Sequence, residues 1–494
     1  MKESTNQYWF NLILMFIIFI GVSSSLINLL NNRSLWLDEA MLGINIVDKS
    51  YKQLLMPLDM NQVAPIGFLY LEKFFTQIFG KVDWALKIFP FISYLASICL
   101  LYFFGRKLTE NKSIVLLACA LFSTNMFIIR YSAEVKQYAS DIFISLLVFT
   151  IAVYYNSFKR NTYLVYFSLL GIIAIGFSNI AIIGLFTVGS YIFLIEIKKD
   201  KKILNYRFIP FLVWIVSFLV YYLFFINNHP TKEFMTRYWV QQKGFLPGNI
   251  FSVQFYLFLY SKTRMILPFL LGFKYNIFVS LFAFIMGLLF TKRKSVFFLC
   301  LFPLLIHLIL SAFELYPFEK RTALYLMPFF ILLISTGIIS SFNFFTNRFI
   351  KLPVYILLAF LVLNLIHVLK NIPTENEEVK KSLSYIDSKI QDSDNINVYF
   401  ITEPAYMFYR NQYKGLKDKP FKILGNWKMK TWPEYENQIR SIGGKSWLVF
   451  SEVYPIGSLN GEDFIIKTLE SFGHKVLSKR KFTGSSCYEI IKEN

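Results

Sequence analysis

The sequence contains little charge and few residues suited to metal or disulfide chemistry. Only 17% of its 494 residues are charged, whereas soluble proteins carry about 25%, so a soluble globular protein is excluded. Four cysteines are present, and their spacing indicates neither a zinc site nor a disulfide framework. Cys99, Cys119 and Cys300 lie in apolar runs and Cys487 lies near the C-terminus, which favours small buried apolar residues.

The sequence contains long uncharged runs, and 55% of its residues are hydrophobic. A helix needs about 20 mostly apolar residues to cross a bilayer, so the runs predict a polytopic membrane protein of about 11 spans. Residues 161–195 carry no charge, and Gly176, Ser178 and Asn179 near their middle predict two spans joined by a tight turn. The other predicted spans are 8–30, 88–105, 113–129, 142–158, 208–228, 275–291, 295–313, 322–347 and 352–369. The first run lacks a cleavage site, so we expect it to be retained.

Basic residues are unevenly distributed between the two sides of these spans. With the N-terminus inside, the short inside loops are 106–112, 157–162, 198–207, 291–295 and 347–352, and nearly half of their residues are Lys or Arg. The outside loop 31–87 holds only six basic residues. This positive-inside asymmetry predicts a cytoplasmic N-terminus and an extracytoplasmic C-terminal segment. It also accounts for most of the net charge of +20, so nucleic acid is not an expected partner.

The segment after residue 370 has the composition of a soluble domain. Its pattern predicts helices over 376–390, 403–413, 433–442 and 461–474, and strands over 395–402, 421–425, 446–453, 475–482 and 486–492. Alternating strands and helices indicate a small α/β domain. No glycine-rich phosphate fingerprint follows a strand, so we assign this domain no chemistry. Acceptor docking and a passive cap on the membrane domain both remain open.

Two adjacent carboxylates, Asp38 and Glu39, follow the first span in the segment RSLWLDE at 33–39. Neighbouring residues on a helix point about 100° apart, so only one of the two is expected to face an active site. A carboxylate there can act as a general base on an acceptor hydroxyl. The alternative is a surface helix whose first turn carries acids because the helix dipole favours them.

The segment NQVAPIGFLY at 61–70 begins an apolar helical run. Pro65 fits the first position of a helix over 66–80. The run is short and contains Glu72, Lys73 and Gln77, so we expect an interfacial helix and not a span.

A third segment, RYSAEVKQYASD at 130–141, connects two spans on the outside. Arg130, Glu134, Gln137 and Asp141 recur at the spacing of one helix face. Such a face is costly at a membrane unless it lines a cavity. A self-satisfied ladder of ion pairs is the alternative.

The fourth segment is ELYPFEKRTALYLMP at 314–328, in which Lys320 and Arg321 lie at the outer end of a span. An arginine there can pair bidentately with a phosphate. Alternatively, both cations extend to the membrane boundary without a ligand. The long loop 229–274 adds aromatic and basic residues suited to anionic lipid, and a lone candidate metal ligand, His229.

These four segments, in this order, resemble the bacterial GT-C glycosyltransferases of the dolichyl-phosphate-mannose-protein mannosyltransferase superfamily, which includes lipid A aminoarabinose transferases. The matching motifs are Leu-Asp-Glu at 37–39, Pro-x-Gly-x-Leu-Tyr at 65–70, Arg-Tyr-Ser-Ala-Glu at 130–134 and Tyr-Pro-Phe-x-x-Arg at 316–321. The family usually carries two prolines where this chain has Ala64 and Pro65. The resemblance covers residues 1–370.

The resemblance implies an all-α polytopic GT-C domain over 1–370, with outer-face loops 31–87 and 229–274, and an extracytoplasmic α/β domain over 371–494. It implies an inverting hexosyl- or pentosyltransferase of the bacterial inner membrane. The donor would be a sugar on a polyprenyl phosphate, and the acceptor a lipid, polysaccharide or protein. Some relatives use a divalent cation, so one is an open expectation here, without identified ligands.

Site residues carry over from the motifs by the same resemblance. Asp38 is the expected base, and Glu39 or Glu134 the expected second acid. The expected donor-phosphate ligands are Arg321, Lys320, Arg130 and Lys136, and the expected contacts to donor or acceptor are Trp36, Tyr70, Gln137, Tyr138 and Arg237.

Three other functions are possible for a chain with many spans: a transporter, a membrane anchor, and a polymerase or ligase. A transporter or flippase of lipid-linked glycans predicts charges deep in several spans, whereas these spans are nearly free of charge. A simple membrane anchor would not need so many spans. A polymerase or ligase of surface polysaccharide shares the same fold, and the sequence leaves it open.

Overall fold

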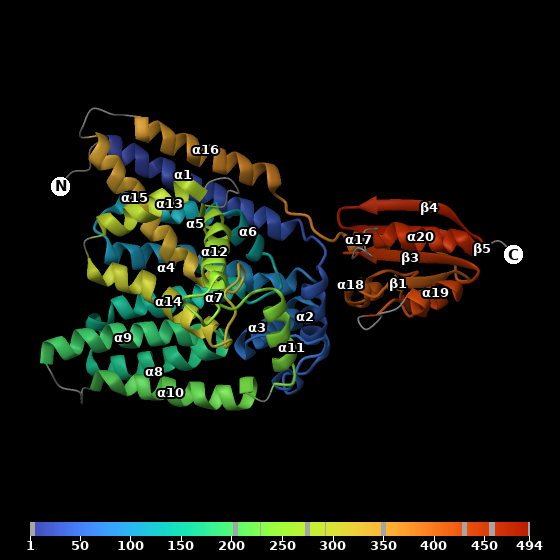
Figure 1. Ribbon diagram of the computed structural model, residues 1–494, viewed down its shortest axis with the longest axis horizontal. Coiled ribbons are helices and arrows are strands. Elements are labelled where there is room, and N and C mark those ends of the chain that lie inside the picture. The colour runs from blue at the N-terminus through green and yellow to red at the C-terminus, as the bar shows by residue number, and fades with distance from the viewer. Residues whose placement is uncertain are drawn as a thin grey trace. The chain divides into compact units, whose positions relative to one another are not determined.

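A computed structural model of the chain describes residues 5–200, 206–227, 229–271, 277–291, 293–346, 352–426, 432–453 and 460–492. The chain divides into two compact units (Figure 1). The first unit comprises Met1–Leu30, Tyr51–Gly80 and Trp84–Pro373, and the second comprises Asn31–Ser50, Lys81–Asp83 and Thr374–Asn494. Two pieces of the predicted first outer loop therefore fold with the C-terminal segment.

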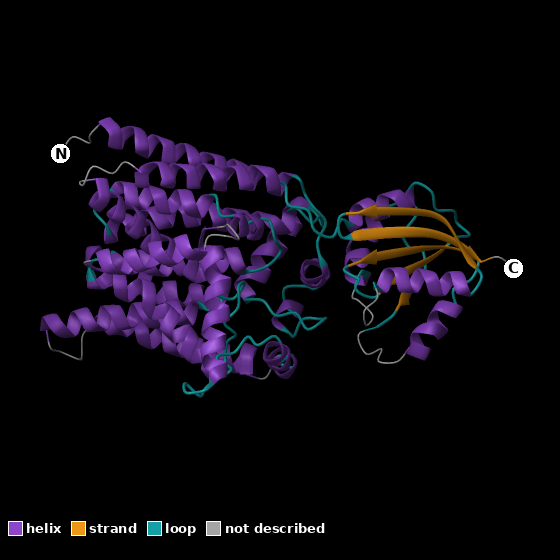
Figure 2. Ribbon diagram, turned by 45° about the horizontal axis from the view of Figure 1, so that its top comes forward, coloured by secondary structure: helices purple, strands orange, loops and turns teal. Residues whose placement is uncertain are grey.

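Helices are the only regular secondary structure among the described residues of the first unit, as Figure 2 shows, so the predicted all-α membrane fold class is confirmed. Its first helices are α1 (Thr5–Leu30), α3 (Ile66–Phe79), α4 (Ile88–Leu108), α5 (Lys112–Ser123), α6 (Met126–Tyr131), α7 (Tyr138–Val153), α8 (Arg160–Phe177) and α9 (Ala181–Asp200). The later ones are α10 (Ile209–Tyr221), α11 (Lys232–Gln241), α12 (Val253–Leu271), α13 (Ile277–Phe290), α14 (Lys294–Ala312), α15 (Met327–Thr346) and α16 (Leu352–Asn371).

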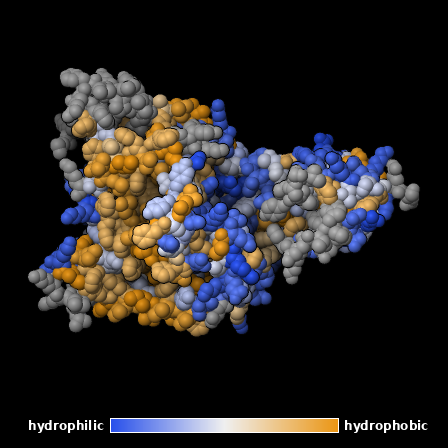
Figure 3. Space-filling view, viewed as in Figure 1, coloured by the Kyte–Doolittle hydropathy of each residue, from blue (hydrophilic) through white to orange (hydrophobic). Residues whose placement is uncertain are grey.

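Seven described helical segments are long and apolar enough to cross a membrane. They are built on α1, α4, α8, α9, α10, α14 and α15, and α10 reaches this length with the helical turns that flank it, over Tyr206–Asn227. Four shorter apolar helices accompany them, formed by α5, α7, α13 and the end of α16. Large apolar side chains on their outer faces are exposed, including Phe16 at 62%, Phe224 at 76% and Phe278 at 82%. Figure 3 shows hydrophobic residues over much of the visible face of this unit. Such a surface suits lipid and not water.

Close helix crossings in the first unit depend on small residues. A Cβ added to Gly337 in α15 would lie 2.0 Å from the carbonyl oxygen of Ala283 in α13. A Cβ added to Gly287 would lie 2.1 Å from the carbonyl oxygen of Leu333. In lipid, helices associate through such close packing because burying apolar surface brings no gain over contact with lipid tails.

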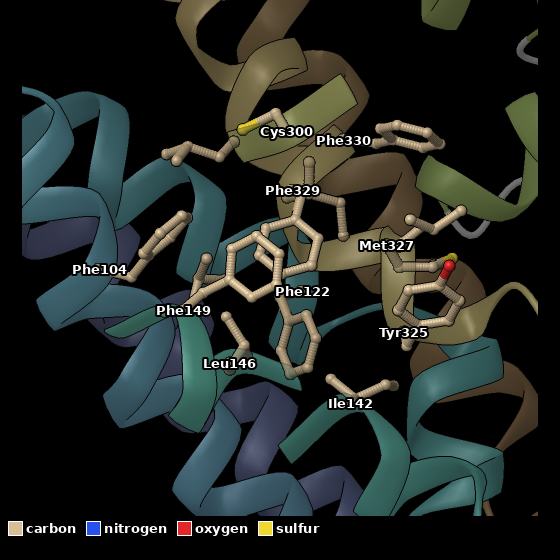
Figure 4. Close-up of a cluster of buried hydrophobic side chains, with 14 of the residues drawn as sticks. Phe104, Phe122, Ile142, Leu146, Phe149, Cys300, Tyr325, Met327, Phe329 and Phe330 are labelled. Carbon is tan, nitrogen blue, oxygen red and sulfur yellow. The ribbon is translucent and has the colours of Figure 1, made fainter. Parts of the chain in front are cut away.

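Aromatic rings fill the interior between α4, α7 and α15 (Figure 4). The ring of Phe149 lies 4.5 Å from that of Phe329, and the ring of Phe104 lies 5.7 Å from Phe329. These tilted and edge-to-face arrangements are the favoured geometry of aromatic pairs. The cluster packs α15 against α4 and α7.

Several sequence expectations meet a definite outcome in this unit. The tight turn within 161–195 is confirmed, since α8 ends at Phe177 and α9 begins at Ala181. The interfacial run forms α3, although Pro65 is its N-cap and not its first helical residue. Loop 229–274, whose aromatic and basic residues were expected to suit anionic lipid, contains α11 and α12. Of the basic residues used for topology, Lys201, Lys202, Lys292, Arg348 and Lys351 lie outside the described residues.

The second unit contains a mixed five-stranded sheet in the order β2-β1-β3-β5-β4. Its strands are β1 (Asn395–Tyr399), β2 (Phe421–Leu424), β3 (Lys445–Ser451), β4 (His474–Phe482) and β5 (Ser485–Lys492). β1 pairs in parallel with β2 and β3, whereas β5 pairs antiparallel with β3 and β4. Its helices are α2 (Leu37–Asp48), α17 (Val379–Asp387), α18 (Glu403–Tyr409), α19 (Trp432–Arg440) and α20 (Gly461–Ser471). The predicted C-terminal α/β fold is confirmed.

The apolar core of the second unit combines residues from distant parts of the chain. Tyr399 and Ile401 from the end of β1, Phe450 from β3, and Leu37 and Met41 from α2 belong to one buried cluster. Leu37 and Met41 are one helical turn apart and so lie on the same face of α2. Helix α2 is therefore anchored in the core of the α/β fold.

Candidate functional site

The segment between α6 and α7 brings several predicted site residues together. The expected continuous helix face over 130–141 is wrong, because α6 ends at Tyr131 and α7 begins at Tyr138. Ser132 interrupts the helix: its hydroxyl donates to the Ile129 carbonyl at 2.7 Å and lies 2.6 Å from the hydroxyl of Ser25 in α1. Glu134, Lys136 and Gln137 thus lie in a turn.

Arg130 and Glu134 still form an ion pair across this turn. Their closest atoms, Nη2 and Oε1, are 3.5 Å apart. The Glu134 side chain is only 1% exposed, whereas that of Arg130 is 43% exposed. The guanidinium therefore remains accessible to a ligand while the carboxylate orients it from below.

Lys136 is the second basic residue of the turn, and it is buried. Its ammonium group donates to the side-chain oxygen of Gln62 at 2.8 Å. Gln62 is also buried and lies just before α3. The hydrogen bond connects the 61–70 motif to the 130–134 motif, which the sequence placed together only by analogy.

Gln137 and Tyr138 begin α7 beside the same turn. Within the described structure, the side-chain oxygen Oε1 of Gln137 is buried without a hydrogen-bond partner. The ring of Tyr138 contacts that of Tyr131 edge-on at 5.2 Å. A buried acceptor without a donor is costly, so the Gln137 amide is suited to a bound hydroxyl group.

Arg321 lies in the loop between α14 and α15, with its guanidinium carbon 5.2 Å from the centre of the Trp239 ring in α11. Removal from water raises the pKa of Tyr316 well above its usual value; Asp141 adds to this rise and the positive charge of Arg321 opposes it. Tyr316 therefore lies within the electrostatic influence of both Asp141 and Arg321. Asp141 in turn accepts a hydrogen bond from Ser178 at 2.6 Å.

Buried hydrogen bonds fix this loop from below. The ring nitrogens of His307 lie 3.0 Å from the Pro317 carbonyl oxygen and 3.2 Å from the Tyr325 hydroxyl. The Thr322 hydroxyl donates to the same carbonyl at 2.7 Å. On the other side, Phe318 N–H donates to the Gly244 carbonyl at 2.8 Å. The loop that carries Arg321 is thus held by His307 of α14, by Tyr325 just before α15 and by Gly244.

Lys320 lies beside an apolar crevice between α12 and α15. Its ammonium nitrogen is 5.5 Å from the centre of the Phe269 ring. The preceding Glu319 pairs with the buried Lys262 of α12, which ties α12 to the loop. The crevice is narrow, with a volume of about 10 Å³. Its lining residues are Ile266, Phe269, Lys320, Ala323, Leu326, Met327 and Phe330.

Two other expected ligands of the first unit have different surroundings. The Tyr70 hydroxyl donates to the Tyr51 carbonyl at 3.0 Å, and the two rings pack edge-on. Tyr70 thus serves the local fold of α3. Arg237 is exposed on α11, on the helix that also carries Trp239.

Trp36, Asp38 and Glu39 belong to the second unit. Glu39 is completely buried and pairs with Arg33 Nη1 at 2.6 Å. It also accepts from the backbone N–H of Trp36 at 3.3 Å, which caps the start of α2. Asp38 and Trp36 are half-buried. Both acids therefore lie in the first turn of a helix, as they would also do without a catalytic role. They differ in exposure, and only Asp38 is accessible to a substrate.

Two glutamates from the C-terminal segment lie near Asp38. Burial raises the pKa of Glu452, and the negative charge of Asp38 adds to this rise. Burial also raises the pKa of Glu377, which shares a hydrogen bond with Glu452 and accepts one from the N–H of Leu37. Glu377 and Glu452 thus join the two acids in the first turn of α2, Asp38 and Glu39. Among the described residues, no group of three or more His, Cys, Asp or Glu side chains is arranged to hold a metal ion.

Sequence reasoning missed several of these residues. His307 is the one histidine inside the predicted span 295–313, and an ionisable group at such a position signals function or a buried partner. Asp141 was noted only as part of a helix face. Glu377 and Glu452 lie in the soluble segment, where acids are common and no local pattern marks them.

Comparisons with known proteins found a family model and solved structures that resemble this chain. Residues 63–226 match the family model described as dolichyl-phosphate-mannose-protein mannosyltransferase. No curated protein matches the chain in sequence. Among solved structures, ArnT from Cupriavidus metallidurans in the apo state matches with a TM-score of 0.56 at 10% identity, covering 98% of both chains. The same protein bound to undecaprenyl phosphate matches with a TM-score of 0.54 at 9% identity, covering 98% of this chain and 97% of that one.

The range that matches the family model includes the second and third motifs, Pro65–Tyr70 and Arg130–Glu134. The structural match extends over nearly the whole of both chains. Together they confirm the resemblance inferred from the motifs and identify this chain as a multi-pass membrane protein with the fold of the GT-C glycosyltransferases.

Proposed function

We propose that this protein transfers a hexose or pentose from a polyprenyl phosphate to an acceptor on the outer face of the bacterial inner membrane, with inversion at the anomeric carbon. The observation that most supports this proposal is the placement of basic side chains beside aromatic and apolar surface: Arg321 lies over the Trp239 ring, and Lys320 lies at a small crevice whose other lining side chains are all apolar. A polyprenyl phosphate has the complementary parts, an anionic head for the cations and an apolar chain for the apolar helix surface. The similar structure of ArnT bound to undecaprenyl phosphate adds support.

The basic residues of the first unit would stabilise the leaving phosphate. Arg321 is directed by its contact with Trp239, and Lys136 by its hydrogen bond to Gln62. Lys320 and Arg130 remain accessible. Charge develops on the phosphate oxygen as the sugar departs, and cations already oriented toward that charge lower the barrier without reorganising.

Asp38 is the proposed general base. Its carboxylate takes the proton of the acceptor hydroxyl or amine, and the acceptor atom bonds to the anomeric carbon on the face opposite the phosphate. The bond from that carbon to the phosphate oxygen breaks, and its electron pair leaves with the polyprenyl phosphate. Glu39 is unsuited to this step because it is completely buried and paired with Arg33.

The remaining predicted residues take roles in binding. Glu134 is the proposed second acid, which orients the acceptor. The proposed contacts to the sugar or acceptor are Trp36, Gln137, Tyr138, Arg237 and, through the position of α3, Tyr70. The orphan oxygen of Gln137 is the most specific of these, because it needs a donor such as a sugar hydroxyl.

Release of free polyprenyl phosphate tests this proposal. The full chain and Asp38→Asn are reconstituted in lipid nanodiscs with labelled polyprenyl-phosphate sugars and a membrane extract as acceptor. Release that depends on Asp38, with one labelled sugar added to each product, supports the transferase. A ladder of products indicates a polymerase instead, and movement of intact donor across vesicles without release indicates a flippase.

A further inference from the structure

We propose that the C-terminal α/β segment of the second unit positions α2 for catalysis, with Glu377, Lys380 and Tyr409 as positioning residues for Asp38. This inference rests on the proposed function, in which Asp38 is the base. It assigns a role to a segment in which the sequence shows no chemistry of its own.

The sheet topology provides the place where α2 binds. From β1 the chain continues to β2 on one side and returns to β3 on the other side of β1. In α/β folds, such a reversal opens a crevice at the carboxyl ends of the parallel strands, where ligands usually bind. Tyr399, Ile401 and Phe450, near the carboxyl ends of β1 and β3, cluster with Leu37 and Met41. Helix α2 therefore occupies the position of a ligand.

Three backbone hydrogen bonds hold the residues that lead into α2. The N–H of Lys380 donates to the Ser34 hydroxyl at 3.0 Å, and the N–H of Leu35 donates to the Tyr409 hydroxyl at 2.8 Å. The N–H of Leu37 donates to Glu377. The Lys380 ammonium group also contacts the Asn32 carbonyl. Asp38 follows directly on a segment whose backbone is fixed by the C-terminal residues.

The side chains of Lys380 and Tyr409 also hold a second piece of the outer loop, residues 81–83. Asp83 Oδ2 accepts from the Tyr409 hydroxyl and from the Lys380 ammonium group, each at 2.8 Å. Tyr409 is completely buried, and Asp83 is 3% exposed. The Tyr409 hydroxyl thus donates to Asp83 while it accepts from Leu35. One phenol oxygen connects both loop pieces to the α/β fold.

This arrangement matters for catalysis because a general base acts only within hydrogen-bond reach of its proton. A shift of about 1 Å in such a group can cost about 100-fold in rate. Glu377, Lys380 and Tyr409 are not expected to touch the substrate. Their loss should therefore lower kcat through the position of Asp38 and leave donor binding intact.

Tyr409→Phe is the sharpest test, because it removes a single oxygen atom. Tyr488→Phe is the matched control: Tyr488 is also a buried phenol bonded to a carboxylate, Glu462, and among the described residues its hydroxyl makes no hydrogen bond to either loop piece. Both variants of the full chain are compared in nanodiscs for kcat, donor KM, melting temperature and amide exchange in peptides covering 31–48. We expect Tyr409→Phe to lower kcat about tenfold or more, with donor KM within about twofold and with faster exchange in 31–48. We expect the control Tyr488→Phe to leave both kcat and amide exchange in 31–48 unchanged.

Ser34→Ala provides a second variant should Tyr409→Phe fail to fold, since it removes only the hydroxyl that accepts from Lys380. Faster exchange in 31–48 with unchanged kcat overturns the positioning role while the proposed function stands. Equal effects of Tyr409→Phe and Tyr488→Phe also overturn it, because the loss would then be general destabilisation. A wild type that releases no polyprenyl phosphate contradicts the proposed function, whereas unaltered exchange in the Tyr409 variant contradicts the docking of α2.

Discussion

Arg33 and Glu39 form a 2.6 Å ion pair in which neither side chain is more than 2% exposed. The neighbouring carboxylate, Asp38, is half-buried and lies beside Glu452. Two acids adjacent in the sequence thus have opposite surroundings. One stabilises the start of α2, and the other remains accessible to a substrate.

Substitutions at these two positions should therefore separate stability from catalysis. We expect Asp38→Asn to leave the melting temperature close to that of the wild type and to lower the release of polyprenyl phosphate by orders of magnitude. We expect Glu39→Gln to leave Arg33 without its counter-charge and to destabilise the protein by about 3 kcal/mol or more. Thermal unfolding in detergent measures stability, and release assays at a permissive temperature measure activity. A destabilised Asp38→Asn that keeps its activity, or a stable Glu39→Gln that loses it, would contradict these assignments.

Arg321 should be the cation whose loss most reduces turnover. Because its charge is proposed to act on the leaving phosphate, Arg321→Ala should lower kcat by about 100- to 1000-fold. Arg321→Lys should restore only part of the rate, since an ammonium group lacks the planar fork of a guanidinium group. Lys232→Ala, at the exposed start of α11, is a control for loss of one positive charge. Equal rates for the Arg321 and Lys232 variants would show that only net charge matters.

The stability of the second unit should depend on pH through Glu377. Burial raises the pKa of this carboxyl group to about 8, and the nearby Glu452 adds to the rise. In the unfolded chain the group ionises near pH 4.5, so between these values the folded state binds the extra proton. Stability from this group is therefore fully present below about pH 4.5 and is lost as pH rises to 8.

Glu377→Gln should remove this pH dependence, because the amide imitates the protonated carboxyl group toward both Leu37 N–H and Glu452. Its melting temperature should exceed that of the wild type by an amount that grows from pH 5 to pH 8 and is then constant. Glu377→Ala lacks the acceptor for Leu37 and should not show this gain above pH 8. A constant difference between Glu377→Gln and the wild type across the whole range would contradict the raised pKa.

Helix packing in the membrane unit should be sensitive at Gly337 and tolerant at Gly176. A Cβ at Gly337 meets the Ala283 carbonyl oxygen at 2.0 Å, whereas nothing lies within 4 Å of a Cβ at Gly176. We expect Gly337→Val to force α13 and α15 apart and to lower the yield of folded, monodisperse protein severely. Gly176→Val should be recovered at the wild-type yield. Size-exclusion chromatography of the two variants, expressed in parallel, checks the difference.

Much of the fold could be predicted because its signals are local. The strands and helices of the C-terminal segment follow from apolar alternation and periodicity, and β4 and β5 are found within a residue or two of their predicted bounds. The break between α5 and α6 was not predicted, although Asn125 caps α6 through its side chain. Helix α12 was missed because Lys262 and Arg264 interrupt its apolar run. The structure shows that Lys262 is buried against Glu319.

The site was predictable only as a set of motifs. Spacing alone suggested that Arg130 and Glu134 interact, and they do. No local pattern connects Lys136 with Gln62, or Asp83 with Tyr409, since these pairs are 74 and 326 residues apart. Such contacts depend on the tertiary fold. The assignment of Asp38 and Arg321 to chemistry therefore stays a prediction for the release assay.

The second unit is assembled from an early and a late part of the chain, which affects the order in which the protein folds during synthesis. Helix α2 leaves the ribosome early, but Tyr409, which holds it, is synthesised more than 300 residues later. Until then Leu37 and Met41 lack the core in which they are buried. Contacts between residues so far apart in sequence form late, and domains generally fold as units during synthesis. The helix with the proposed base would thus be completed only after all membrane helices have been made, so a prematurely terminated chain would occupy the membrane without an assembled catalytic group.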